Sequence, residues 1–243
     1  MSFDALVAHL LDGSATDGVM AIENTIAGSI IPNYALIDSN NLHIVGEEYL
    51  NIHHHLMALP GQTIKSIKEV WSHPMALLQC KEFFKKYPHI KLVEDVDTAE
   101  VAKRISKENI KGVAAIAPKI AAEIFGLEVL EDDIQTIKDN STRFVIVQTQ
   151  KPTIAPDIIN KASLKFQLNH KRGSLAAVLN VLSDCKMNLT KIQSLPVIET
   201  PWKYSFFVDV TFDQITDYQK LVKIIEIMAE EFKILGTYKN GRK

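Results

Sequence analysis

Three polar residues, Glu23, Asn24 and Thr25, follow the short apolar run of residues 18–22, which has the length of a strand. We expect a helix to begin after this strand, so that its free N–H groups attract a carboxylate while Asn24 and Thr25 add neutral hydrogen-bonding groups. Ligands of open α/β sheets collect at such strand ends. An anionic substrate would suit this segment, although Asn24 or Thr25 could instead be a simple helix cap.

A second polar pair, Ser72 and Gln79, lies in the segment SHPMALLQC. The spacing puts both side chains on one face of a helix, two turns apart. Gln79 shares that face with apolar neighbours, where a side-chain amide is costly unless it is hydrogen-bonded. A ligand could supply the bond. The alternatives are that Ser72 caps the helix and that Gln79 is bonded to protein or water.

Thr142 and Arg143 stand directly before the apolar run that begins at Phe144. A strand here places Thr142 and Phe144 on one face and Arg143 on the other. The planar guanidinium of Arg143 could bind a carboxylate, although a solvated arginine at a strand edge is the commoner case. Spacing alone therefore gives neither residue a catalytic role.

The consecutive histidines His53, His54 and His55 are a weak candidate for a metal site. In a strand only His53 and His55 point the same way, and no carboxylate or cysteine spacing completes a ligand set. No glycine pattern typical of nucleotide binding is present either. We therefore expect neither a metal nor a cofactor.

The composition is that of a globular protein whose length of 243 residues suits two domains. A net charge of −2, from 27 basic and 29 acidic residues, lacks the electrostatic pattern of a nucleic-acid binder. The first residues have neither a basic region nor an unbroken apolar stretch, so we expect no membrane span and a cytoplasmic location. Cys80 and Cys185 occupy apolar positions of probable helices, which indicates buried thiols rather than a disulfide.

Residues 1–150 alternate short apolar runs with helical periodicity, which predicts an α/β architecture. The expected strands lie at residues 18–22, 42–46, 91–93 and 112–116, and the expected helices at residues 74–87 and 97–106. Residues 151–162 contain two prolines and no clear period, so we interpret them as a linker.

Residues 163–243 have the element order βαββαβ, which is the ferredoxin-like split unit. The expected order is strand 163–169, helix 173–185, strands 189–197 and 202–212, helix 217–232 and a last strand at 233–239. Together with residues 1–150, this predicts a larger α/β region followed by a second, smaller α/β domain.

Taken together, residues 18–30, 69–84 and 112–144 resemble the prephenate dehydratase family, in order, in spacing and in the signatures Glu-Asn-Thr, Ser-His-Pro and Thr-Arg-Phe. The βαββαβ unit resembles the ACT domain that commonly regulates these enzymes. The resemblance implies a two-lobed dehydratase region, similar to periplasmic binding proteins, with its site in the cleft. It also implies that residues 50–59 and 142–148 are the two crossings between the lobes.

The resemblance implies that prephenate is converted to phenylpyruvate, carbon dioxide and water without a cofactor. The family's active-site positions fall on Asn24, Thr25, Ser72, Gln79, Thr142 and Arg143 of this chain. On this reading Thr142 donates a hydrogen bond to the departing hydroxide, and Arg143 anchors a carboxylate. Ser72 and Gln79 position the substrate, and Glu23 is the other possible acid.

Family members usually begin with a strand and a glycine-rich loop beside the substrate, for which this chain has no counterpart. The resemblance therefore implies a first lobe that lacks one wall of the cleft, so the chain either starts late or has lost activity. Two rival functions stay open: an impaired protein that only senses an amino acid, and the same chemistry on arogenate.

The resemblance also implies an effector site, built from residues 173–176 and 193–196, between the subunits of a homodimer or a homotetramer. Its members here are Gly173, Ser174, Leu175, Ala176, Gln193, Ser194, Leu195 and Pro196. The family's Glu-Ser-Arg-Pro has become Gln-Ser-Leu-Pro, which removes both charges. The expected ligand is L-phenylalanine, held by the loop N–H groups and by the neutral amide of Gln193.

Overall fold

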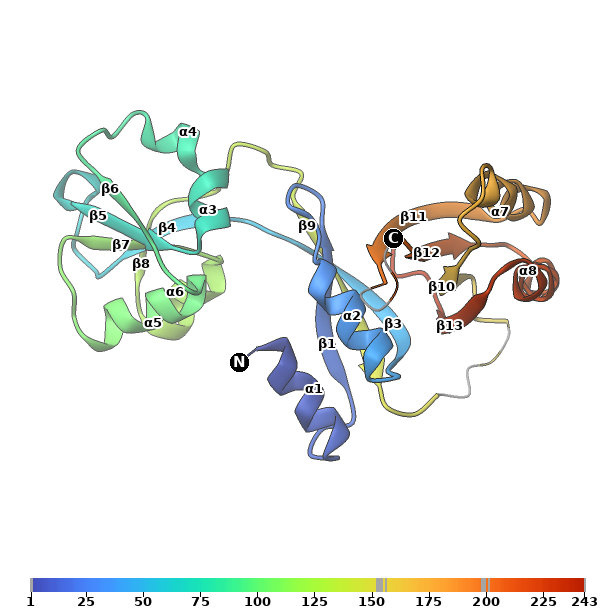
Figure 1. The fold of residues 1–243 in the computed structure, drawn as a ribbon. Coiled ribbons are helices and arrows are strands. Elements are labelled where there is room, and N and C mark those ends of the chain that lie inside the picture. The colour runs from blue at the N-terminus through green and yellow to red at the C-terminus, as the bar shows by residue number, and fades with distance from the viewer. Residues whose placement is uncertain (1, 152–154, 156, 198–199, 201, 243) are drawn as a thin grey trace. The chain divides into compact units, whose positions relative to one another are not determined.

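The structure is a computed structural model, shown in Figure 1, and it describes residues 2–151, 155, 157–197, 200 and 202–242. The chain forms two compact units. Unit 1 consists of Met1–Asn24, Gly28–Leu50 and Thr142–Lys243, and unit 2 of Thr25–Ala27 and Asn51–Ser141. The expected linker includes residues 152–154 and 156, which lie outside the described residues. No helix in the described part of the chain is long and apolar enough to cross a membrane.

Unit 2 is a mixed sheet covered by helices on both faces. Its strands, in the order β6-β5-β7-β4-β8, are β4 (His55–Ala58), β5 (Glu69–Ser72), β6 (Lys91–Glu94), β7 (Val113–Ala117) and β8 (Glu128–Glu131). Its helices are η1 (Ile64–Ser66), α3 (Pro74–Gln79), α4 (Lys81–Phe84), α5 (Thr98–Lys107) and α6 (Lys119–Phe125). Strand β7 is buried along its whole length, as its run of apolar residues requires.

Two apolar cores fill the two faces of this sheet. One joins the sheet to α3 and α4 through residues such as Leu77 and Phe84. The other joins it to α5 and α6 through residues such as Ile105 and Ala122. Asp97 caps α5, and its carboxylate accepts the N–H groups of Ala99 and Glu100. The expected strands at 91–93 and 112–116 correspond to β6 and β7.

Unit 1 contains two four-stranded sheets. The first has the order β2-β1-β9-β3 and is built from β1 (Gly18–Asn24), β2 (Gly28–Ser29), β3 (His43–Asn51) and β9 (Ser141–Gln148). Helices α1 (Phe3–Leu11) and α2 (Ile31–Ser39) pack against it and bury Leu10 and Ile37 in the core.

The second sheet of unit 1 has the ferredoxin-like order β11-β12-β10-β13. Its elements are β10 (Lys161–Gln167), α7 (Ser174–Asp184), β11 (Asn188–Pro196), β12 (Tyr204–Thr211), α8 (Ile215–Met228) and β13 (Glu231–Tyr238). The predicted βαββαβ order is therefore confirmed, with the first strand beginning at Lys161 rather than at Ser163. Figure 1 shows α7 and α8 together on one face of this sheet, where they share an apolar core with β10 and β12.

The other face of the second sheet packs against the first sheet. Phe207, Leu235 and Tyr238 belong to the same apolar core as the residues of β1, β3 and β9. The two backbones come so close that a Cβ atom built on Gly236 would lie 2.0 Å from the carbonyl oxygen of Ile44. The two sheets of unit 1 therefore share one interior.

Two local expectations from the sequence are wrong. Residues 23–29 form a hairpin in which Asn24 pairs with Gly28, not the start of a helix, because Gly28 adopts φ +81 and the helix begins only at Ile31. The helix expected over residues 74–87 is two short helices separated at Cys80. In consequence, Asn24 is not a helix cap, and no helix N-terminus lies at this position.

Candidate functional site

Asn24 and Thr142 form a hydrogen-bonded pair on neighbouring strands of unit 1. They lie opposite each other where β1 pairs with β9, and the Asn24 amide donates to the Thr142 hydroxyl oxygen over 3.0 Å. Both side chains are half-buried. Because the Thr142 oxygen accepts this bond, its own O–H proton stays available for donation. This pair can therefore stabilise negative charge that develops on a nearby oxygen.

The opposite face of the same strand pair carries charged residues. The alternation expected for β9 is present: Arg143 is buried, while Thr142 and Phe144 are half-buried. Glu23 lies opposite Arg143, after a register shift between Ala21 and Glu23 that re-aims the end of β1. Arg143 and Glu23 therefore do not share a face with Asn24 and Thr142.

The Arg143 guanidinium lies in a buried ion network between the two sheets of unit 1. It donates to Glu47 over 2.6 Å, to Asp209, and to the hydroxyl of Tyr238 over 3.0 Å. Lys161 donates to both carboxylate oxygens of Glu47 over 2.8 Å. Burial opposes the positive charge of Arg143, but attraction to Asp209 and its other partners outweighs this, so the pKa of Arg143 lies above its usual value.

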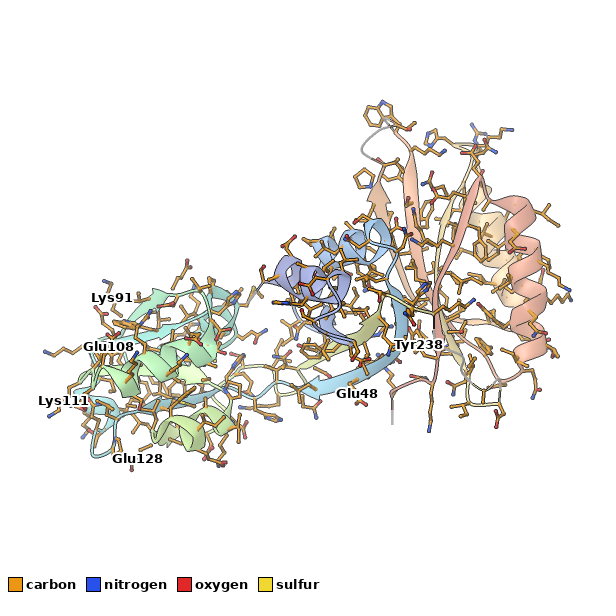
Figure 2. All side chains as sticks on the ribbon, turned by 90° about the horizontal axis from the view of Figure 1, so that it is seen from below. Glu48, Lys91, Glu108, Lys111, Glu128 and Tyr238 are labelled. Carbon is orange, nitrogen blue, oxygen red and sulfur yellow. The ribbon has the colours of Figure 1, made fainter. Side chains whose placement is uncertain are left out.

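This network occupies the donor groups with which Arg143 was expected to bind a carboxylate. Its side chain is 5% exposed. Tyr238, at the end of β13 and labelled in Figure 2, is fully buried beside it. No sequence pattern indicates Glu47 or Asp209 as partners, because they lie 96 and 66 residues from Arg143 in the chain.

Glu23, the other expected acid, is an ion-pair partner in the structure. Its carboxylate lies 2.9 Å from the ammonium of Lys191 and 4.0 Å from the guanidinium of Arg143. Lys191 belongs to β11 and also donates to the Ser29 hydroxyl over 2.8 Å. The hairpin that carries Asn24 is thus tied to the ferredoxin-like sheet.

Thr25 is hydrogen-bonded to Ser141 within unit 2. Its N–H donates to the carbonyl of Ser141 over 2.9 Å, and its hydroxyl accepts from the N–H of Ser141 over 2.9 Å. The exposed Thr25 therefore has a structural role at the point where the chain enters unit 2.

Ser72 and Gln79 do not share a helical face, which corrects the expectation from their spacing. Ser72 ends β5 and is fully buried, and its hydroxyl donates to the carbonyl of Ile116 over 2.8 Å. Helix α3 starts two residues later at Pro74, with His73 as its cap. Ser72 therefore holds two strands together and caps no helix.

Gln79 lines an apolar hollow of about 300 Å³ in unit 2. The other residues of the hollow are Ile26, Met75, Leu78, Lys81, Glu82, Thr136 and Ile137. The Gln79 side-chain oxygen accepts from His54 over 2.7 Å and from Asn140 over 3.1 Å. The Gln79 amide, whose burial without a partner would be unfavourable, is hydrogen-bonded by protein groups. It also lines a hollow that could hold a ligand. Lys81 and Thr136 belong to no sequence motif, so only the structure places them at this hollow.

His53 and His55 are paired with aspartates. Their Nδ1 atoms lie 2.7 Å from Asp133 and 2.9 Å from Asp132, respectively. Within the described part of the chain, no group of three or more histidine, cysteine or acidic residues could hold a metal ion.

The expected effector residues of α7 border a second hollow, of about 150 Å³, in the ferredoxin-like part of unit 1. Ser174 and Leu175 line it, together with residues of the loop that follows β10 and residues around the start of β12. Gly173 caps α7 with φ +84, a conformation that favours glycine, and Ala176 follows as an exposed residue of that helix.

The second expected effector segment, residues 193–196, lies on β11. Leu195 packs against the core shared by the two sheets, and Pro196 pairs with Tyr204, which borders the hollow. Gln193 donates its amide to the carbonyl of Ser194 over 3.0 Å. None of the residues from Gln193 to Pro196 lines this hollow.

The candidate site residues lie in a region that matches a known protein family. Residues 1–152 match the model of the family described as Prephenate dehydratase. This chain belongs to the prephenate dehydratase family. The matched region contains Asn24, Gln79 and Thr142.

A curated relative in the prephenate dehydratase family is the chloroplastic arogenate dehydratase/prephenate dehydratase 2 of Arabidopsis thaliana. It is 35% identical over 98% of this chain and 64% of its own length. The chain spans 62% to 64% of the length of the first curated relatives that it matches.

Solved structures share the fold along almost the whole chain. The prephenate dehydratase of Staphylococcus aureus has a TM-score of 0.84 and 26% identity, and the match covers 98% of this chain and 88% of that one. A structure described as GqqA, a novel type of quorum quenching acylases, has a TM-score of 0.87 and 27% identity, over 98% of this chain and 87% of that one. The mixed α/β fold of these structures therefore extends through the ferredoxin-like sheet.

Proposed function

We propose that this chain carries out the prephenate dehydratase reaction, in which prephenate becomes phenylpyruvate, carbon dioxide and water. The ring carboxylate leaves as carbon dioxide, the electron pair of the broken C–C bond enters the ring, and the 4-hydroxyl departs as hydroxide, which takes up a proton. Formation of the aromatic ring supplies the driving force. Membership of the family and the Asn24–Thr142 pair support this function.

Thr142 is the proposed donor to the departing hydroxide. A threonine hydroxyl is a weak acid, so it acts by hydrogen-bonding the charge that develops on the leaving oxygen rather than by full proton transfer. The bond from Asn24 supports this assignment, because Thr142 is the acceptor in it and keeps its O–H proton for donation to another oxygen.

Asn24→Asp is predicted to lower kcat by about a hundredfold, the scale of losing one preorganised donor. A carboxylate at this position would accept the Thr142 proton and so reverse the hydrogen bond. Steady-state kinetics on prephenate measure the change, and thermal unfolding should show an unchanged Tm.

The matched control is Asn24→Ala, which leaves the Thr142 proton free but less well oriented. We expect a smaller loss of kcat than for Asn24→Asp. A loss as large as that of the aspartate variant would mean that the direction of the hydrogen bond is irrelevant.

Gln79 and the hollow beside it are the proposed substrate-binding groups of unit 2. Lys81 lines the same hollow and provides a positive charge for a carboxylate. Within unit 2, Thr25 and Ser72 are the proposed structural supports, because their hydroxyls are bonded to the backbone of Ser141 and Ile116.

Arg143 and Glu23 are proposed to position the strands rather than to contact the substrate. Their partners Asp209 and Lys191 lie on β12 and β11, so the two site-bearing strands are held by the ferredoxin-like sheet. This assignment replaces the expected roles of carboxylate anchor and acid.

Turnover assays on prephenate and arogenate test the proposed activity. Conversion of prephenate to phenylpyruvate supports it. A preference for arogenate would mean that the chain catalyses the same type of reaction on a different substrate. Absence of both reactions, with L-phenylalanine still bound, would favour a protein that only senses an amino acid. Cleavage of an acylated amine would instead indicate the activity given for the GqqA structure.

The ferredoxin-like part of unit 1 is proposed to be an ACT regulatory domain that binds L-phenylalanine. The hollow beside Ser174 and Leu175 supports this role, because the first turn of α7 offers free N–H groups to a carboxylate. Gln193 would add its neutral oxygen, as an acceptor for the ammonium, from a second copy of the chain. This proposal includes a homodimer or a homotetramer.

Gly173→Val is predicted to abolish the binding of L-phenylalanine to the intact chain. A Cβ atom at Gly173 would meet no atom within 4 Å, so the cost arises from the left-handed φ of +84, which a β-branched residue strongly disfavours. Titration calorimetry on the full chain measures the binding, and Gln193→Ala should weaken it.

Gly126→Val is the matched control, because Gly126 also has a positive φ and open space around its Cβ position but lies in unit 2. It should leave the calorimetric signal intact. No heat from the parent chain at millimolar phenylalanine would remove the sensor role.

A further inference from the structure

The orientation of the Gln79 amide is fixed by two buried donors. A side-chain carbonyl oxygen has two lone pairs, and both are used here, by His54 Nε2 at 2.7 Å and by Asn140 Nδ2 at 3.1 Å. His54 is 5% exposed and Asn140 1% exposed. Water therefore has little access to the inner side of this amide.

The ring of His54 shows which nitrogen carries the proton. Its Nδ1 atom is buried and has no hydrogen-bond partner among the residues that the structure describes. A buried N–H without an acceptor is rarer and costlier than an acceptor without a donor. The proton therefore belongs on Nε2, where the Gln79 oxygen accepts it.

The surroundings of His54 favour the neutral form of its ring. Burial lowers its pKa from the usual value, and the nearby His55 and His53 add to the effect, whereas the bond to Gln79 opposes it. With Nε2–H as the donor, a flipped Gln79 would place its own NH₂ group against an N–H. The amide is thereby held with its oxygen inward and its two N–H groups outward, on the side of the hollow that it lines.

We infer that His54 is a positioning residue which, together with Asn140, presents the Gln79 amide to the hollow purely as a hydrogen-bond donor. Such a group selects a ligand that carries acceptors, such as a carboxylate, and Lys81 lines the same hollow with a positive charge. That this ligand is prephenate rests on the function proposed above, whereas the orientation of the amide does not.

A double-mutant cycle tests the inference through substrate affinity. Gln79→Leu and His54→Phe should each raise KM by about tenfold or more, the scale of one hydrogen bond to a charged group. Their effects should not add, because His54 acts only through Gln79. Additive effects in the double variant would overturn the inference.

Two variants of matched burial serve as controls. His54→Gln keeps an N–H group near the position of Nε2 and should restore most of the affinity that His54→Phe loses. His55→Phe removes an equally buried histidine that pairs with Asp132 instead, and it should leave KM unchanged. A His54→Gln variant no better than His54→Phe would mean that the ring only fills space.

Nitrogen NMR of the parent protein with labelled histidine provides a test that needs no substrate. We expect His54 to show a protonated Nε2 and an unprotonated Nδ1 at neutral pH. The Gln79→Leu variant should contain a smaller fraction of this tautomer. A protonated Nδ1 would overturn the inference even if prephenate turns over. The expected pattern without turnover would retain the orienting role and reject only the proposed reaction.

Discussion

Thr142→Ala is expected to lower kcat for prephenate by about a hundredfold or more, the usual scale for the loss of one preorganised donor in an active site. The fold should be unaffected, because Thr142 is half-buried and its recorded partner is the amide of Asn24. Steady-state kinetics of the parent and the variant measure kcat, and thermal unfolding of both proteins measures their stability.

Thr142→Ser is the control for this prediction, because it keeps the hydroxyl and removes only the methyl group. It should retain most of the activity. If the alanine variant equals the parent, Thr142 has no part in the mechanism, and the donor to the leaving hydroxide must be sought elsewhere.

Arg143→Ala is expected to cause a large loss of stability, about 3–5 kcal/mol, because it removes the cation that two buried carboxylates share. Glu47 and Asp209 are 4% and 5% exposed and would both lose a charged hydrogen bond. The Tm should fall by roughly 10 °C for a unit of this size.

Lys85→Ala is the control, because it removes one positive charge and one ion pair from the surface. Lys85 lies 2.8 Å from Glu82, with side chains that are 65% and 55% exposed. Exposed pairs contribute little, so the free energy of unfolding should change by less than about 1 kcal/mol. A similarly small change for Arg143→Ala would show that the buried network does not hold the two sheets together.

The face of each residue on β9 could be predicted, because side chains of a strand alternate strictly. The partners on that face could not. Arg143 finds Glu47 and Asp209 through the packing of one sheet on another, and no local pattern encodes such contacts.

The hairpin after β1 was mistaken for a helix start because Gly28 and the polar residues before it suit both structures. The difference depends on the positive φ of Gly28 and on the pairing of Glu23 with Ser29. Ser72 and Gln79 were mistaken for neighbours on one helix because their spacing fits two turns. Pro74 starts the helix only after Ser72 has ended a strand.

Strand β10 shows a further limit of sequence reasoning. Its alternation of apolar and polar residues is typical of a strand with one face in water. Here Lys161, Ser163 and Lys165 are nevertheless 2% to 6% exposed, because the first sheet of unit 1 covers that face. Strand β3 supplies Glu47 and helix α2 supplies Asp38 as counter-charges.

The interior shared by the two sheets of unit 1 also limits how this chain can recombine with its relatives. Phe207, Leu235 and Tyr238 complete a core whose other half comes from residues before Asn51 and from β9, and Gly236 leaves no room for a side chain against Ile44. A ferredoxin-like segment transplanted from another protein at residues 150–162 would bring a surface fitted to a different neighbour. Inheritance of the two parts together, with compensating changes on both sheets, is the route that this packing leaves open to evolution and to the design of chimeras.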